Sequence, residues 1–163
     1  MGSPQEAARH GDVVIVATPW GVTLDVVGSV AADLAGKIVW DTTNPLKPDM
    51  SGLAIGTTTS AGEEIAKVAA GAPVVKAVPP FAEVLHSPST TIAGQRPGVF
   101  VCGDDPNARA TILRLVDDID AEGVDAGPLT LARYTEPLGM LLVQLAYMQR
   151  MGPRIGSVLI HDN

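Results

Sequence analysis

The stretch Asp12-Val13-Val14-Ile15-Val16-Ala17 decides the fold of this chain. Its apolar residues follow one another without alternating with polar ones, which is typical of a strand buried on both faces of a parallel sheet. Thr18-Pro19-Trp20-Gly21 ends the strand, and apolar residues then recur at helical spacing up to Gly36. Residues 12–36 therefore predict a strand followed by a helix.

The same order of strand and helix repeats along the chain. A helix is predicted after Ser60, in a capping-box sequence, and another at Pro106, after Asp104 or Asp105. A long loop connects Thr42 to Ser60. Further strands are predicted at residues 37–41, 73–78, 99–102 and 123–126. Strands alternating with helices predict an α/β fold of the Rossmann type, a mostly parallel sheet flanked by helices.

The last predicted element is a C-terminal helix over about residues 130–151. Its apolar stripe is assigned to the core, and its breadth leaves room for a dimer face, so a homodimer is predicted. The stripe consists of Leu138, Leu141, Leu142, Leu145 and Met148. A length of 163 residues, 46% of them hydrophobic, predicts one domain over residues 1–163.

The motif G-x-G-x-x-G does not occur in the sequence. A dinucleotide-binding domain opens with a strand, this loop, and a helix whose N-terminus binds the pyrophosphate. We therefore expect a partial domain, truncated at its N-terminus. Residues 13–16 would then form an open apolar sheet edge. Another polypeptide or a second copy would cover that edge, unless the reading frame begins further upstream.

Charge and cysteine content exclude several classes of function. A net charge of −7 disfavours binding to nucleic acid. Cys102 is the only cysteine, so we expect neither a disulfide nor a metal site, and a reducing cytoplasm fits best. Its apolar strand predicts a buried, inert thiol. No segment is apolar over the roughly 18 residues of a membrane span.

Several motifs occur in an order that resembles the NADPH-dependent coenzyme F420 reductases (F420:NADP oxidoreductases). The "TNPL" sequence of Thr43-Asn44-Pro45-Leu46 is similar to the end of one strand of that family. The other matching segments are residues 12–20, 36–41, 60–66, 99–105, 125–129 and 132–138. The resemblance covers about residues 6–160.

The resemblance implies an oxidoreductase that binds NADP and coenzyme F420 in one cleft. Hydride would pass directly between the two rings, so no catalytic side chain is required. Two features depart from the family pattern. The missing phosphate loop predicts impaired binding of the dinucleotide. Val78-Pro79-Pro80-Phe81 stands where the family often has a Phe-Asn-Thr or His-Thr type sequence.

Candidate cofactor-binding residues lie at the predicted carboxyl ends of strands, where ligands bind in open α/β sheets. Thr18, Pro19 and Trp20 follow the first strand, and Trp20 either stacks on a ring or simply packs in the turn. Asn44 and Pro45 follow the second strand. Asn44 either hydrogen-bonds a ribose or carboxamide or forms a local turn.

Three further candidates have strong structural alternatives. Val78 and Pro79 end the third strand, where proline is first of all a rigid strand stop. Arg133 either reaches an anionic tail of F420 or pairs with a neighbour such as Glu136 or Asp125. We expect Thr18, Asn44 and Val78 to open onto one crevice.

Two other functions remain open. The chain could be a non-catalytic Rossmann-like module for binding or dimerisation, because the phosphate loop is absent. It could also be an NADP-dependent reductase of another acceptor, such as ferric iron or a small carbonyl compound.

Overall fold

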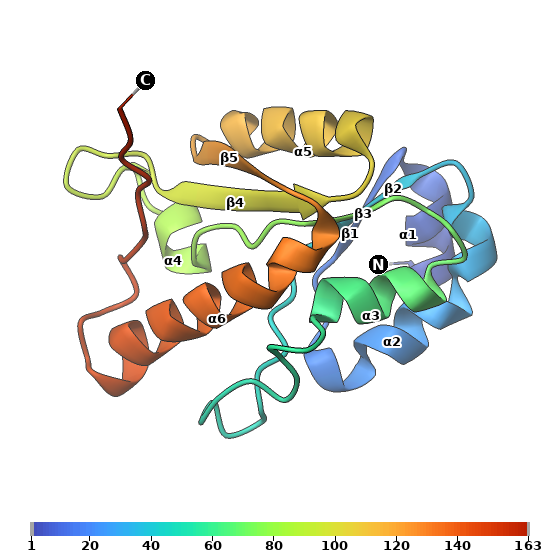
Figure 1. The fold of residues 1–163 in the computed structure, drawn as a ribbon, viewed down its shortest axis with the longest axis horizontal. Helices are drawn as coiled ribbons and strands as arrows, with labels where there is room; N and C mark the ends of the chain where they lie inside the picture. Colours follow the sequence, from blue (N-terminus) through green and yellow to red (C-terminus); the bar gives the residue numbers. More distant parts are fainter. Residues whose placement is uncertain (1, 163) are drawn as a thin grey trace.

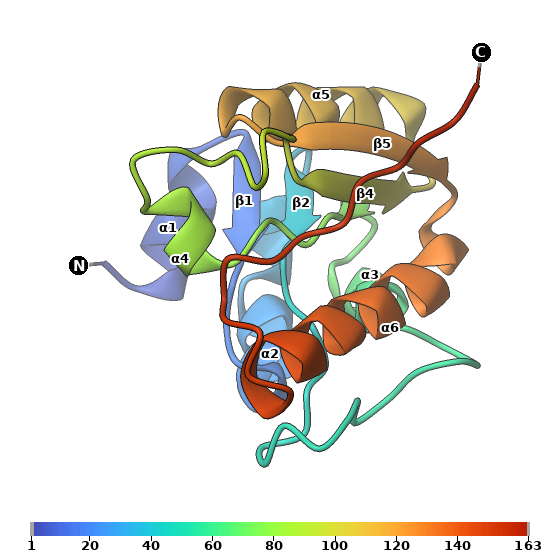
Figure 2. The ribbon, with the colours of Figure 1, turned by 90° about the vertical axis from the view of Figure 1, so that its left-hand side faces the viewer.

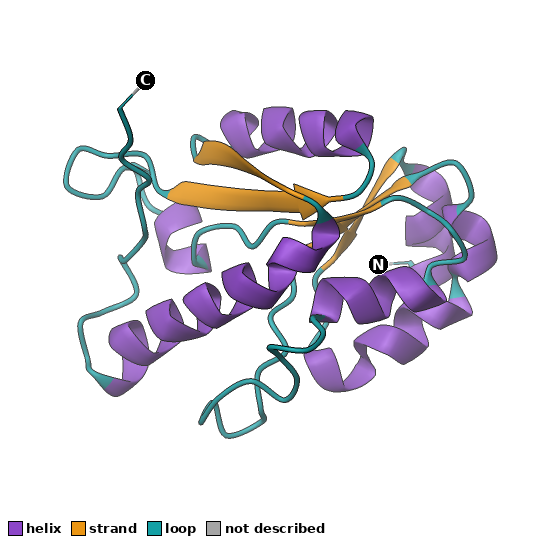
Figure 3. Cartoon of the chain, viewed as in Figure 1, coloured by secondary structure: helices purple, strands orange, loops and turns teal. Residues whose placement is uncertain are grey.

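A computed structural model describes residues 2–162 and contains a five-stranded sheet whose spatial order follows the chain (Figures 1 and 3). All strands predicted from the sequence are present, with ends shifted by up to two residues. They are β1 (Val13–Val16), β2 (Ile38–Asp41), β3 (Val74–Lys76), β4 (Gly98–Gly103) and β5 (Glu122–Gly127). The prediction of an α/β, Rossmann-like fold with a mostly parallel sheet is confirmed.

One pair of neighbouring strands is antiparallel. Strands β1, β2 and β3 run parallel, with Val16 beside Asp41 and Asp41 beside Lys76. Strand β4 runs against β3, and β5 follows β4 in parallel. Because Lys76 lies beside Cys102, the first residues of β4 extend past the end of β3. The carboxyl ends of three strands and the start of β4 therefore meet at one edge.

Helices cover both faces of the sheet (Figures 1 and 2). One core cluster joins β1 and β2 to the N-terminal helices and includes Val39. The other joins β2, β3 and β4 to α5 and includes Trp40, the next residue along β2. The strand thus buries successive side chains on opposite faces, as the unbroken apolar run predicts. The helices are α1 (Pro4–His10), α2 (Trp20–Ser29), α3 (Ala61–Val68), α4 (Ala82–Leu85), α5 (Pro106–Asp118) and α6 (Ala132–Val143).

Local capping signals place the starts of α3 and α5 where the sequence predicts them. Ser3 and Glu6 form a complete capping box at α1. The Ser60 hydroxyl accepts a hydrogen bond from the backbone of Glu63 at α3, and the Asp105 carboxylate accepts two at α5. Between β2 and α3 the chain forms the expected long loop. The one-turn helix α4 has no counterpart among the predicted elements.

The core face predicted for α6 is wrong in part. The predicted stripe includes Leu141 and Met148, which are 52% and 45% exposed. The buried residues of the helix lie on a neighbouring face and comprise Ala132, Glu136, Met140 and Val143. The helix carries more apolar residues than one face can bury, so periodicity alone cannot choose its orientation. A charged residue, Glu136, lies at the centre of the face that is chosen. Beyond Val143, residues 144–148 continue as a π-helical turn.

Among residues 2–162, none of the helices combines the length and apolar character that crossing a membrane would require.

Candidate functional site

The loop after β2 is held in place by hydrogen bonds at the edge where the parallel strands end. Thr42 donates through its backbone and its hydroxyl to the carbonyl of Val16 at the end of β1. The Asp41 carboxylate accepts from the backbone of Thr43 at 2.8 Å and from its hydroxyl at 2.7 Å. This self-contained turn presents the next residue, Asn44, toward α6.

A cavity of about 190 Å³ lies between this edge of the sheet and α6. Asn44 and Val78, predicted from different strand ends, both line it, together with Thr135 of α6. Other walls are apolar and include Leu46, Phe81, Phe100, Leu138 and Leu142. Asn44 Oδ1 and Thr135 Oγ1 are buried without a hydrogen-bond partner. Unpaired buried polar atoms are costly, so these two are candidates to bind a ligand.

Thr18, Pro19 and Trp20 form the turn into α2. Thr18 lines a separate cavity of about 300 Å³ beside β1, between α1 and α2, and not the cavity that contains Asn44. Its hydroxyl lies 2.9 Å from that of Thr23. Trp20 is half-buried against the core cluster of α2 and α3. The first turn of α2 has neither a side-chain cap nor an acidic residue.

The remaining candidates, Pro45, Pro79 and Arg133, line neither of these two cavities. Pro45 is buried and Pro79 half-buried. Arg133 forms a two-pronged ion pair with Glu63 at the start of α3, at 2.9 and 2.6 Å. These hydrogen bonds from Arg133 hold the pKa of the Glu63 carboxyl below its usual range.

The alternative partners named for Arg133 were wrong. Glu136 turns away from it into the core, and Asp125 pairs with Arg109 at 2.9 Å.

Sequence analysis missed a cluster of three charged side chains, all completely buried. Lys76 Nζ lies 2.6 Å from Asp41 Oδ2 and 3.0 Å from Glu136 Oε1, and donates to the carbonyl of Thr43 at 2.7 Å. We call Lys76, Asp41 and Glu136 the buried charge cluster. The signal that could have found it is a lysine inside the apolar run of β3, because lysine is almost never fully buried unless it is paired.

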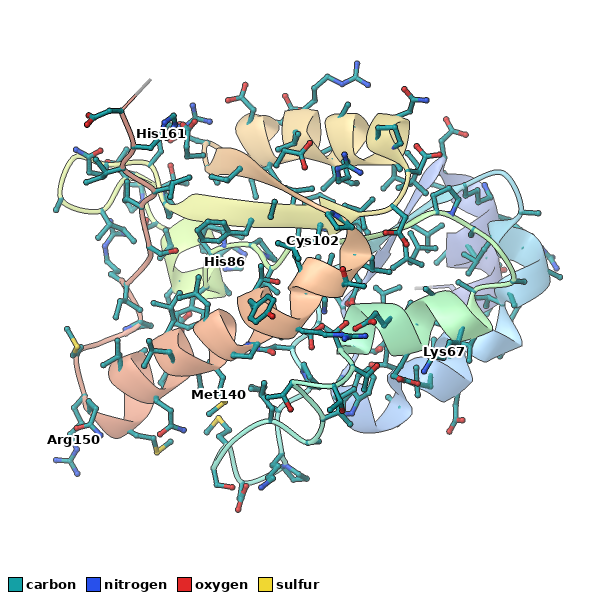
Figure 4. All side chains as sticks on the ribbon, in the orientation of Figure 1. Lys67, His86, Cys102, Met140, Arg150 and His161 are labelled. Atoms are coloured by element: carbon teal, nitrogen blue, oxygen red, sulfur yellow. The ribbon has the colours of Figure 1, made fainter. Side chains whose placement is uncertain are left out.

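Cys102 is fully buried, as predicted, next to the start of α6 (Figure 4). Burial raises the pKa of its thiol to about 11, so the group is protonated and unreactive at neutral pH. The histidines are all exposed and lie on different segments; His86 and His161 are visible apart in Figure 4.

Known proteins are similar to this chain in sequence and in fold. Residues 1–45 match the family described as "NADP oxidoreductase coenzyme F420-dependent". The F420-dependent NADP reductase of Methanocaldococcus jannaschii is 30% identical over 149 residues, which is 86% of this chain and 65% of that protein. The chain thus spans about two thirds of the length of this curated relative.

Solved structures agree with these sequence matches. A protein from Arthrobacter sp. FB24, assigned as an F420-dependent NADP reductase, superposes with a TM-score of 0.87 at 26% identity. The match covers 98% of this chain and 74% of that one. Pyrroline carboxylate reductase from Plasmodium falciparum is 12% identical and superposes with a TM-score of 0.54. That match covers 92% of this chain and 52% of the other chain, and it shows a shared fold alone. By sequence and by fold, this chain is similar to the coenzyme F420-dependent NADP oxidoreductases.

Proposed function

We propose that this chain is an oxidoreductase that transfers a hydride between NADPH and coenzyme F420. The observation that carries the proposal is the cavity at the carboxyl ends of the parallel strands, where Asn44 Oδ1 and Thr135 Oγ1 are buried without partners. Apolar walls with a few convergent polar groups are typical of cofactor sites. A cavity of about 190 Å³ has room for one ring, so the rest of each cofactor would lie outside it.

The start of α2 is the proposed site for the phosphate-bearing part of NADPH. The N-terminus of a helix attracts anions through its free N–H groups and its dipole. At the N-terminus of α3 these N–H groups are already bound, because the Glu136 carboxylate accepts hydrogen bonds from the backbone of Ala61 and Gly62. The first turn of α2 has no such internal anion. Thr18, Pro19 and Trp20 would therefore border the cofactor.

Asn44 and Thr135 are proposed to orient a ring by hydrogen bonding. Asn44 Oδ1 can accept from a carboxamide N–H, and the Thr135 hydroxyl can donate or accept. Pro45, Val78 and Pro79 would shape the rim of the site. Arg133 would contact the acidic tail of F420 through the N–H groups that Glu63 leaves free.

The two cofactors supply the hydride donor and acceptor, and the protein holds their rings together and excludes water. Proximity and orientation would account for the acceleration. Reduction of F420 also takes up one proton, which solvent at the rim of the site would supply, so no side chain has to transfer it.

The proposal is tested by following F420 reduction by NADPH at the deazaflavin absorbance band. This chain would be compared with a version carrying the strand, glycine-rich loop and helix of a family relative ahead of residue 1. We expect turnover by the extended version and slower or no turnover by the chain itself. Asn44→Leu in the extended version should reduce turnover at least tenfold, because one oriented hydrogen bond is lost. Absence of turnover in the extended version rejects the assignment, and an acceptor screen then tests other reductases.

A second candidate function is a non-catalytic binding or dimerisation module. It is favoured by the exposure of Ile15, 57% accessible on β1, which is an edge strand among the described residues 2–162. This function predicts no NADPH binding by the chain. Micromolar affinity measured by calorimetry would exclude it.

We also propose that the chain forms a homodimer through the outer face of α6. Tyr134 and Leu141 on α6, and Met148 in the π-helical turn that follows it, recur every seven residues, and each is at least 45% exposed. Residues at this spacing form a stripe that a second copy can cover. Leu141→Glu should convert a dimer into a monomer in sedimentation experiments, whereas Arg114→Glu on α5 should not. A wild-type monomer at high micromolar concentration would contradict the proposal.

A cytoplasmic location stays a prediction.

A further inference from the structure

The two carboxylates and one ammonium of the buried charge cluster come from three separate elements. Asp41 ends β2, Lys76 ends β3, and Glu136 lies in α6. The Lys76 ammonium has three N–H donors. Three oxygen atoms surround it, one each from Asp41, Glu136 and the backbone of Thr43. Because the Glu136 oxygens also accept from the first backbone N–H groups of α3, the cluster connects the sheet to both helices.

The cluster holds the residue that precedes Asn44 from both sides. The backbone N–H and the hydroxyl of Thr43 are bound by Asp41, and its carbonyl is bound by Lys76. Thr43 therefore has no freedom to rotate either of its peptide groups while the cluster is intact. The direction in which the chain leaves Thr43 sets the position of Asn44.

The cluster also sets the distance between Asn44 and α6. Gly139 follows Glu136 by three residues, so both lie on one side of the helix. Asn44 packs so closely on Gly139 that a methyl group added there would lie 2.8 Å from Asn44 Nδ2. The amide of Asn44 is thus placed between a loop held by Lys76 and a helix held by Glu136.

A gain in folding stability does not explain why the buried charge cluster consists of charged side chains. Removing three charged groups from water costs free energy, and apolar side chains of similar volume stabilise a core as well or better. Charged groups require a defined geometry, because each N–H must meet an oxygen, whereas apolar side chains tolerate sliding.

We infer that the buried charge cluster is a positioning device that orients the Asn44 amide at the ligand cavity. Lys76, Asp41 and Glu136 do not line that cavity, so they are positioning residues that act through Thr43 and Gly139. The consequence for ligand binding rests on the proposed function, whereas the effect on Asn44 itself does not.

The first measurement uses the ligand-free chain labelled with nitrogen-15 in asparagine. The sequence contains Asn44, Asn107 and Asn163, and Asn44→Asp identifies the signal of interest. We expect two variants to shift the side-chain amide signal of Asn44 and to leave that of Asn107 in place. One is Glu136→Gln; the other is Thr43→Val, which keeps all three charges paired and should fold even if Glu136→Gln does not. An unchanged Asn44 signal in folded Thr43→Val overturns the inference.

Arg109→Met is the matched control. Arg109 binds a carboxylate, Asp125, and the backbone carbonyl of Gly103, so its contacts resemble those of Lys76 but involve none of the residues of the buried charge cluster. It should leave the Asn44 signal unmoved, and a shift as large as in Thr43→Val would overturn the inference.

The second measurement is NADPH affinity by titration of the extended version described above. Thr43→Val should weaken binding by roughly tenfold, the worth of one well-placed hydrogen bond, and Arg109→Met should not change it. If the Asn44 signal shifts but wild-type protein does not bind NADPH, positioning stands and the proposed function fails. If NADPH binds and the Asn44 signal does not shift, the proposed function stands and the inference fails.

Discussion

Lys76→Met should lower the free energy of unfolding by about 3–5 kcal/mol, the largest effect expected from a single substitution in this chain. The methionine fills a similar volume, but Asp41 and Glu136 then keep their charges in a site that no water reaches. Their carboxylates lie against one ammonium in the wild type, so its loss leaves them uncompensated and mutually repulsive. The measurement is urea unfolding followed by circular dichroism at neutral pH.

Two comparisons separate this explanation from a general loss of packing. Arg109→Met breaks a half-exposed ion pair and should cost about 1 kcal/mol or less. Adding Asp41→Asn and Glu136→Gln to Lys76→Met removes all the charges and should restore most of the stability. If the triple variant is as unstable as Lys76→Met, the loss does not come from uncompensated charge.

Met140→Ala should destabilise the chain by roughly 2–5 kcal/mol, whereas Leu141→Ala should change stability by less than about 0.5 kcal/mol. The two residues are adjacent in α6, but Met140 is 8% exposed and Leu141 is 52% exposed. Truncating the buried side chain leaves a cavity, and truncating the exposed one removes little buried surface.

Both variants can be compared with wild type in the same urea titration, at a protein concentration where all three have the same oligomeric state. The apolar stripe read from the sequence predicts the opposite order, because it includes Leu141 and omits Met140. Equal losses, or a larger loss for Leu141→Ala, would contradict the orientation of α6 seen in the structure.

The strands and helix starts could be predicted from the sequence because they depend on residues close together in the chain. An unbroken apolar run such as Val13–Val16 indicates a strand, and only the burial that it predicts on both faces is wrong, because Ile15 is 57% exposed. The Ser60 and Asp105 caps bond to backbone groups two or three residues away, so local sequence decides them. The same reasoning placed candidate residues at strand ends, and Asn44 and Val78 do meet in one cavity.

Thr18 shows the limit of that reasoning. The carboxyl ends of β1, β2 and β3 share an edge, but a shared edge does not make a shared cavity. The turn into α2 and the surrounding side chains place Thr18 beside one cavity, whereas Asn44 lines another. The shape of a site depends on how side chains fill the space above the strands, and spacing along the chain does not contain that information.

By itself the sequence determined the order of strands and helices, their caps and the buried character of Cys102, since these follow from local periodicity and local hydrogen bonds. Only the tertiary structure decided which face of α6 is buried, that β4 runs against β3, and that Arg133 pairs with Glu63. The same holds for Lys76 and Glu136, which are 60 positions apart and meet without exposure to solvent. Contacts between distant residues are chosen by packing the whole chain at once, where a buried charge must find its counter-charge.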